Sequence, residues 1–158
     1  PLLLVGRVGQ LCLGDRLNRF GWVVGIVPFD PQSKPVKRTA FGRFCRECVA
    51  PSMADNGQLA FYSGDDTRGE YVYKFVPSQR FDKADMHKNR DILDEGTLYV
   101  GRFNDDGTGR WLPLIHGNEG LTAENGFPNQ AEVLGNARAA ADMLLAIIPI
   151  RRLHRERG

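Results

Sequence analysis

Residues 64–76 read GDDTRGEYVYKFV, a turn rich in carboxylates that leads directly into a strand. Tyr71, Tyr73 and Phe75 alternate with Val72 and Val76. Alternating aromatic and β-branched residues are typical of a pleated strand with two distinct faces. The pattern therefore predicts a strand over 70–76, with a glutamate at its first position.

The carboxylates of this stretch suggest a cation site. Asp65 and Asp66 follow Gly64 in a turn that can bend around an ion, while Glu70 is expected on the rigid strand. Calcium takes about six to eight oxygen ligands and tolerates irregular geometry, so the three side chains are able to supply part of one site. The alternative is an ordinary charged hairpin turn, because Gly-Asp-Asp is common turn chemistry.

The rest of the chain also favours β-structure. The 158 residues suit one domain, and 18 glycines and 9 prolines indicate many turns. Further strands are expected over 20–27, 36–44, 58–62, 97–103 and 110–114, with hairpin turns over 55–57 and 104–109. Residues 81–93 are expected to form a long loop or a short helix. Sequence pattern alone leaves a sandwich, a barrel and a propeller open.

One segment departs from the β pattern. Pro128 and Asn129 form a plausible helix start. Apolar residues then recur at three- and four-residue spacing, at Leu134, Ala137, Ala141, Leu144 and Ile148. The spacing predicts one amphipathic helix over 129–148 whose apolar face packs on the core.

Charge and hydropathy exclude two classes of partner. Net charge is +2, from 21 basic and 19 acidic residues, and no basic stripe with interleaved aromatics occurs, so nucleic-acid binding is not expected. The basic cluster over 151–157 is interpreted as a solvated tail. The apolar opening over 1–5 is too short for a membrane span and lacks the features of a signal peptide.

Cysteine and histidine spacing gives little support for a zinc site. Cys45 and Cys48 form a single Cys-x-x-Cys pair and Cys12 stands apart. Zinc needs a second pair or histidines at ligand spacing, and the histidines are scattered. We interpret the thiols as structural or incidental, with a disulfide or a metal pair as the alternative.

Several segments occur in the order found in one known family. They include NRFGWVV (18–24), PFDPQS (28–33), KRTA (37–40), the opening stretch 64–76, LDEGTLYV (93–100), DGTGRWLPL (106–114) and LTAENGF (121–127). Together these segments resemble the PhoX family of bacterial alkaline phosphatases. The resemblance covers residues 18–145 and leaves 1–17 and the basic tail 146–158 unmatched. It implies that residues 1–158 form a single partial segment of a longer chain.

The resemblance implies a fold class and an activity. The expected fold is all-β with one helix, forming about two blades of a six-bladed β-propeller. Such proteins are exported in folded form, so a periplasmic or extracellular location is implied. They hydrolyse phosphate monoesters at a cluster of calcium and iron ions held mainly by carboxylates. The implied partners are a small phosphorylated substrate and the remainder of the propeller chain.

The resemblance also ranks candidate site residues. Glu70 is the first candidate metal ligand and Glu47, which the family pattern retains, is the second; Asp65 and Asp66 are weaker candidates. Glu47 and Glu70 are expected to face the same end of adjacent strands. Arg68 and Arg151 are candidate phosphate ligands, since an arginine fork matches phosphate oxygens. No catalytic nucleophile is assigned.

Departures from the family pattern leave two functions open. Gly25 and Val27 stand where the family carries carboxylates, and Leu153 stands at the position of an active-site glutamate. We therefore expect an impaired fragment of a metal-dependent alkaline phosphatase. The alternative is a non-catalytic β-propeller segment that binds a structural cation or a protein partner.

Overall fold

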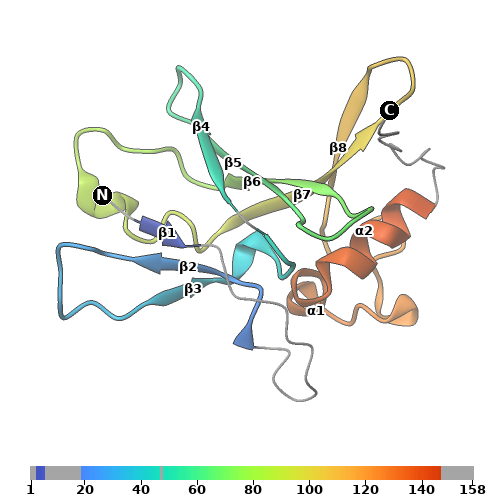
Figure 1. The fold of residues 1–158 in the computed structure, drawn as a ribbon, viewed down its shortest axis with the longest axis horizontal. Helices are drawn as coiled ribbons and strands as arrows, with labels where there is room; N and C mark the ends of the chain where they lie inside the picture. The colour runs from blue at the N-terminus through green and yellow to red at the C-terminus, as the bar shows by residue number, and fades with distance from the viewer. Residues whose placement is uncertain (1–2, 6–18, 47, 147–158) are drawn as a thin grey trace.

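The computed structural model describes residues 3–5, 19–46 and 48–146, which form two antiparallel sheets and two α-helices (Figure 1). The first sheet has the order β1 (Leu3–Val5), β2 (Val23–Ile26), β3 (Val36–Arg38). The second is a five-stranded meander of β4 (Ala50–Met53), β5 (Leu59–Gly64), β6 (Val72–Pro77), β7 (Gly96–Phe103) and β8 (Gly109–Pro113). The helices are α1 (Gln130–Gly135) and α2 (Ala137–Ala146). Short 3-10 turns are η2 (Thr39–Phe41), η3 (Met86–Asn89) and η4 (Ala123–Asn125).

Strand β6 lies at the centre of the five-stranded sheet, and its predicted alternation is confirmed. Tyr73 and Phe75 are buried, whereas Val72 is exposed. The predicted start was wrong, because the strand begins at Val72 and Glu70 precedes it. The backbone closes a turn first: the Glu70 N–H donates to the Thr67 carbonyl at 3.1 Å.

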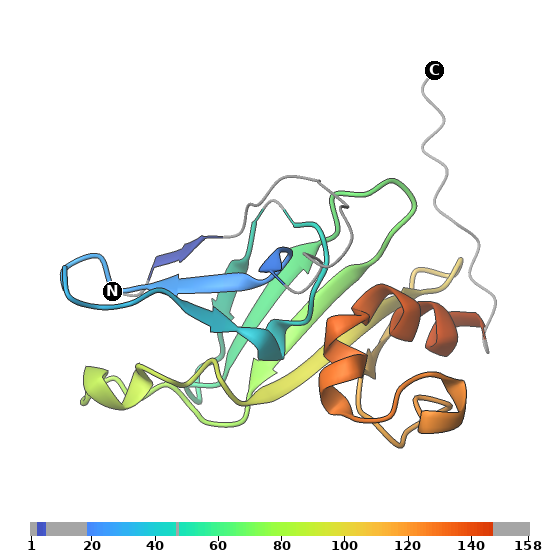
Figure 2. The same cartoon turned by 90° about the horizontal axis from the view of Figure 1, so that it is seen from below.

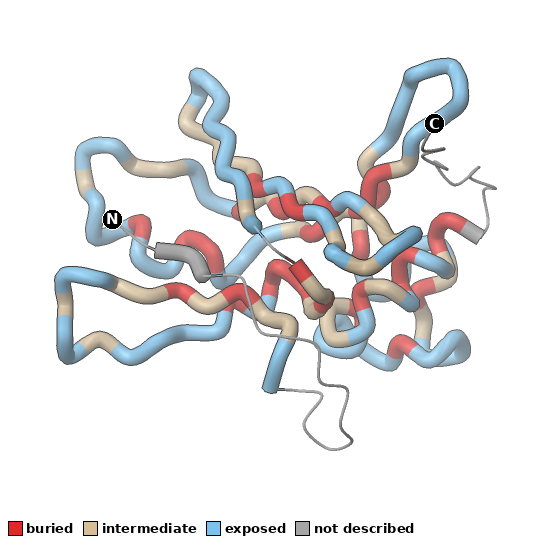
Figure 3. Tube along the Cα trace, viewed as in Figure 1, coloured by how far each residue is buried: buried red, intermediate tan, exposed pale blue. Residues whose placement is uncertain are grey.

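The core lies between one face of the five-stranded sheet and the elements that cover it (Figures 2 and 3). The Phe41 ring of η2 lies 4.2 Å from the Phe75 ring and 5.4 Å from the Phe61 ring. From the helices, Ala137, Ala140, Ala141, Val133 and Leu144 contribute buried side chains. A Cβ on Gly42 would lie 3.3 Å from Ala137 Cβ, so the start of α2 packs closely against the residue that follows η2.

The predicted single helix is two helices, so the expectation of one helix was wrong. Asn129 caps α1 as predicted, accepting the Glu132 N–H at 3.0 Å. The break falls at Asn136, whose φ of −119° and ψ of 44° are not helical. Its side chain donates to the Glu132 carbonyl at 3.1 Å, a local bond that competes with helix continuation. Residues 147 and 148 lie outside the described part of the chain.

The first sheet is shorter than the sequence predicted. Strand β2 spans four residues rather than the expected 20–27. Strand β3 ends at Arg38 rather than continuing to residue 44, because the chain turns into η2 and then adopts a φ of 70° at Gly42. A Cβ at Gly42 would lie 2.5 Å from Leu98 Cδ2, so a side chain there would clash.

The loop predictions are confirmed and one strand was missed. The hairpin turns over 55–57 and 104–109 join β4 to β5 and β7 to β8, and residues 81–93 contain η3. Strand β4 was not predicted: all four residues are exposed, so no apolar alternation marks it. No helix within the described residues is long and apolar enough to cross a membrane.

Candidate functional site

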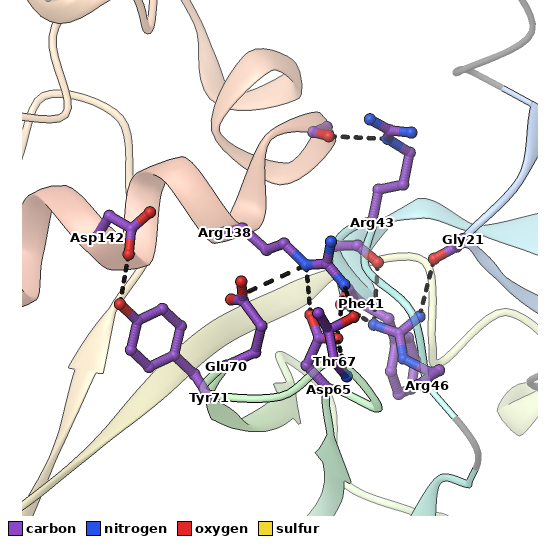
Figure 4. Close-up of polar contacts among 12 residues, drawn as sticks. Gly21, Phe41, Arg43, Arg46, Asp65, Thr67, Glu70, Tyr71, Arg138 and Asp142 are labelled. Atoms are coloured by element: carbon purple, nitrogen blue, oxygen red, sulfur yellow. Dashed lines mark hydrogen bonds and ion pairs between the residues drawn. The ribbon is translucent and has the colours of Figure 1, made fainter. Parts of the chain in front are cut away.

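The carboxylate turn, residues 65–71, joins β5 to β6 and faces the first turns of α2 (Figure 4). Arg138 of α2 donates from Nε to Asp65 Oδ2 at 2.6 Å and from Nη2 to Asp65 Oδ1 at 2.7 Å. The Asp65 side chain is fully buried, while 38% of the Arg138 side chain is exposed. Two parallel bonds to one carboxylate form a strong, directional pair. This hydrogen bonding raises the pKa of Arg138.

Arg138 holds the carboxylate turn at two further points. Its Nη2 donates to Thr67 Oγ1 at 2.6 Å, and its Nε lies 3.9 Å from Glu70 Oε2. Inside the turn, the Thr67 N–H donates to Asp65 Oδ1 at 3.1 Å. One guanidinium therefore contacts the start, the middle and the end of the turn.

A second link between the carboxylate turn and α2 comes from the hydroxyl of Tyr71, which donates to Asp142 Oδ1. Sequence reasoning missed both helix residues. Arg138 and Asp142 are four positions apart, so they lie on the same helix face, and that spacing was the available signal. The sequence separation of 73 residues between Asp65 and Arg138 concealed their pairing.

The four predicted metal ligands have different environments. Both oxygens of Asp65 accept from Arg138, whereas Asp66 is exposed and its N–H donates to the Cys45 carbonyl at 2.8 Å. Glu70 is 25% exposed and faces Arg138. Glu47 lies outside the described residues; its neighbour Arg46 forms a β-bridge with Asp65. Convergence of Glu47 and Glu70 remains a prediction.

Only one of the two predicted phosphate ligands lies within the described residues, so their convergence stays a prediction. Arg68 is exposed at the tip of the carboxylate turn, and Arg151 lies outside the described residues. Cys45 and Cys48 are free thiols, so they do not form the disulfide considered above, and Cys12 is likewise outside the described residues.

The described oxygen donors of the turn do not by themselves make a cation site. In residues 3–5, 19–46 and 48–146, no group of three or more histidine, cysteine, aspartate or glutamate side chains is placed to hold a metal ion. Asp65 already faces a guanidinium, which would repel a second cation. Asp66 is exposed, and 25% of the Glu70 side chain is exposed, although Glu70 Oε2 also lies 3.9 Å from Arg138 Nε. Since calcium needs about six to eight oxygens, a complete site requires ligands from elsewhere.

Arg46 fixes the backbone opposite the carboxylate turn. It is 5% exposed, and its Nη2 donates to the carbonyls of Phe41 at 2.9 Å and Gly42 at 3.0 Å. Its guanidinium carbon lies 3.6 Å from the centre of the Phe44 ring. Burial lowers the pKa of Arg46 to about 10, and the negative charge of Asp65 opposes that shift. This arginine was not predicted from the sequence.

Tyr73 lies beneath the carboxylate turn. Its ring stacks on Phe44 at 4.1 Å, and its hydroxyl is buried without a hydrogen-bond partner among the described residues. Burial raises the pKa of the phenol, and the nearby carboxylates Asp65 and Glu70 raise it further. Tyr73 therefore stays protonated beside the acidic turn.

The chain is similar to known alkaline phosphatases. A family model described as alkaline phosphatase PhoX matches residues 7–155. The chain is similar to a solved structure described as Pseudomonas fluorescens PhoX in complex with vanadate, a transition state analogue, at 52% sequence identity and a TM-score of 0.78. The match covers 81% of this chain and 23% of that chain, so the chain spans less than a quarter of the solved protein's length. No curated protein matches the chain.

Proposed function

The chain belongs to the PhoX family of alkaline phosphatases, and from this premise we propose that it is a segment of a metal-dependent enzyme that hydrolyses phosphate monoesters. The supporting observation is the similarity to the vanadate-bound relative, 52% in identity with a TM-score of 0.78. Vanadate in that protein is described as a transition-state analogue. Because the chain spans 23% of that protein, the activity requires the remaining residues.

Within a complete enzyme, we propose that the carboxylate turn supplies metal ligands. Asp66 is exposed and 25% of the Glu70 side chain is exposed, and Glu47 follows Arg46, whose backbone forms a β-bridge with Asp65 of the turn. Asp65 is a weaker candidate, because both its oxygens accept from Arg138. Calcium and iron, when bound, supply charge that polarises phosphoryl oxygens and stabilises the leaving oxygen.

The chain's own residues also suit substrate binding. Arg68 is exposed at the turn and offers a planar donor fork for phosphate oxygens. Arg151, which lies outside the described residues, is the second candidate. Burial keeps Tyr73 protonated, and the packed core beneath the turn excludes water from one side of it. These features position substrate and shape the site; no nucleophile is assigned to them.

The proposed setting is a six-bladed β-propeller that acts in the periplasm or outside the cell. The two sheets of this chain contribute about two blades to it, and the rest of the propeller is the necessary partner. Gly25 and Val27 lack the carboxylates of the family pattern, so we expect weaker activity than that of relatives that carry them.

A chimera tests the proposed function. Residues 18–145 would replace the matching segment of Pseudomonas fluorescens PhoX, and hydrolysis of p-nitrophenyl phosphate would be assayed at alkaline pH. We expect turnover that EDTA removes and that calcium with iron restores. A folded chimera with no turnover, or with turnover indifferent to EDTA, would contradict the proposal.

One observation favours the alternative of a non-catalytic segment. Asp65 is engaged by an arginine, and the described residues hold no three-ligand group. A structural cation or a protein partner would then be the ligand of this segment. A chimera that retains metal but does not hydrolyse the ester would support this alternative.

A further inference from the structure

The five-stranded sheet has a second face, on the side opposite the core. Lys74 lies on that face, because its neighbours Tyr73 and Phe75 are buried and successive side chains of a strand point to opposite faces. The pairing of β5 to β8 places further residues beside it. The residues of this outer face are Tyr62, Val72, Lys74, Val76, Tyr99, Gly101, Phe103, Trp111 and Pro113.

We propose that the outer face is an interface on which an apolar sheet face of the remaining PhoX polypeptide packs. The inference rests on the proposed function, in which the chain is one segment of a longer enzyme. It names the surface of this segment that meets the rest of that enzyme.

The outer face is apolar and aromatic, although the described residues leave it open. Tyr62, Val72 and Phe103 are 37%, 41% and 52% exposed. All residues of the outer face lie within the described part of the chain, and Lys74 is the only charged one among them. An antiparallel sheet with one face in water normally carries polar residues on that face. A contiguous apolar surface rich in aromatic residues is instead typical of a contact with another protein surface.

The aromatic rings of the outer face form a continuous surface. The Trp111 ring lies 5.8 Å from the Tyr62 ring and 6.4 Å from the Phe103 ring. A Cβ at Gly101 would lie 3.1 Å from an atom of the Phe103 ring and 3.1 Å from one of the Trp111 ring. The missing side chain therefore lets both rings lie against the sheet. Such a surface suits a second sheet, since two sheets pack face to face through their side chains.

Lys74 is part of the same surface. Its Nζ lies 4.7 Å from the centre of the Trp111 ring and 5.0 Å from that of the Tyr99 ring, where an ammonium is attracted to the ring faces. Partial burial already lowers the pKa of Lys74. A buried charge without a partner is costly, so the surface that covers Lys74 has to bring an oxygen acceptor to it.

The observations favour the remaining polypeptide over a second copy of the chain. The match to the solved relative covers 23% of that protein, so more than three quarters of its length lies outside the matched segment. Two copies packed face to face would bring their Lys74 ammonium groups together, and the outer face carries no carboxylate to separate them. A single lysine also gives no support for an acidic partner such as a nucleic acid.

Hydroxyl-radical footprinting of the chimera tests the interface within one folded protein. Mass spectrometry would measure the oxidation of Phe103, Trp111 and Met86, each relative to the same residue in urea-unfolded chimera. Met86 is the matched control, because it lies in η3, away from the five-stranded sheet, and is 57% exposed. We expect Phe103 and Trp111 to lose most of their reactivity and Met86 to keep its reactivity.

Two footprinting results would overturn the proposal. The first is reactivity of Phe103 and Trp111 in the folded chimera as high as that of Met86, since the outer face would then be open to water. The second is protection that disappears when the chimera is diluted to the monomer, since a second copy would then be the occupant. A folded chimera with a protected outer face but no turnover would refute the proposed function and support the interface.

A charge placed on the outer face gives an independent test. Phe103→Asp and Met86→Asp would be compared by thermal unfolding in the chimera and in the 158-residue chain. We expect Phe103→Asp to lower the unfolding midpoint of the chimera, or to prevent its folding, because the charge is buried there. The midpoint of the 158-residue chain should change little with either substitution, as should that of the chimera with Met86→Asp. An equal loss from Phe103→Asp in both proteins, or no loss in the chimera, would overturn the interface.

Discussion

Asp65 and Asp66 are adjacent in sequence and opposite in environment. The Asp65 side chain is buried and paired with Arg138, whereas Asp66 is exposed. We expect Asp65→Asn to lower the free energy of unfolding by about 1–3 kcal/mol, because it weakens a buried charge-assisted pair. Asp66→Asn should change it by less than about 0.5 kcal/mol. Urea denaturation of the 158-residue chain measures both; equal losses would contradict the distinction.

Tyr73 gives the chain a pH dependence above neutrality. Its folded pKa is raised above the ordinary value of 10.0, first by burial, so the folded state keeps a proton that the unfolded state releases. The stabilising contribution of the Tyr73 phenol is complete below the unfolded-state pKa of 10.0. It is lost as pH rises from there through the higher folded-state pKa. Tyr73→Phe should therefore flatten the fall in unfolding free energy above about pH 10.

At neutral pH the same variant should cost little. The Tyr73 hydroxyl is buried without a partner among the described residues, so its removal should be neutral or stabilising by up to about 1 kcal/mol. Tyr62→Phe is the control, since 37% of Tyr62 is exposed, in contrast to the fully buried Tyr73. Chemical denaturation at a series of pH values gives the comparison. If the free energy of unfolding still falls steeply above about pH 10 in Tyr73→Phe, the alkaline loss of stability comes from other groups and the prediction is wrong.

Helix α1 depends on its cap. Asn129 accepts the Glu132 N–H at 3.0 Å, and the helix has only six residues, so its end effects are a large share of its stability. Asn129→Ala should lower the free energy of unfolding by about 1 kcal/mol, and Asn129→Ser should retain most of it. Thermal unfolding of the two variants checks this; equal loss in both would show that the cap bond is unimportant.

At the scale of elements, local patterns were informative where one face is buried. The alternation of β6 and the glycine turns of the hairpins were predictable, because burial and positive φ leave a mark on the residues themselves. Strand β4 has four exposed residues and leaves no such mark. The break between the two helices did leave a mark in the sequence, the neighbouring residues Gly135 and Asn136. The apolar spacing continues across this pair and therefore concealed the break.

The candidate site was only partly predictable for a different reason. The turn and its acidic residues are local, and the sequence showed them. The Arg138–Asp65 pair joins residues 73 positions apart, and the buried Arg46 is held by backbone carbonyls that carry no sequence signal. Long-range pairing decides that Asp65 is engaged and Asp66 is exposed, so spacing alone could not rank these two carboxylates.

For the whole molecule, we expect the isolated chain to have negligible phosphatase activity even with calcium and iron supplied. The described residues hold no three-ligand group, and the chain spans 23% of the similar solved protein. A chromogenic phosphate monoester assayed with and without EDTA tests this. Turnover by the purified 158-residue chain that EDTA abolishes would refute the expectation and would place a complete site within these residues.

The metal content of the chimera, measured by elemental analysis, tests the central claim most directly, since it asks whether the carboxylate turn of this chain holds the metals. The parent chimera would be compared with an Asp66→Asn, Glu70→Gln double variant. Asp106→Asn is the control, an exposed aspartate in the turn between β7 and β8. We predict that the double variant retains fewer calcium or iron ions than the parent, and that the control retains all of them. Unchanged metal content in a folded double variant would contradict the account.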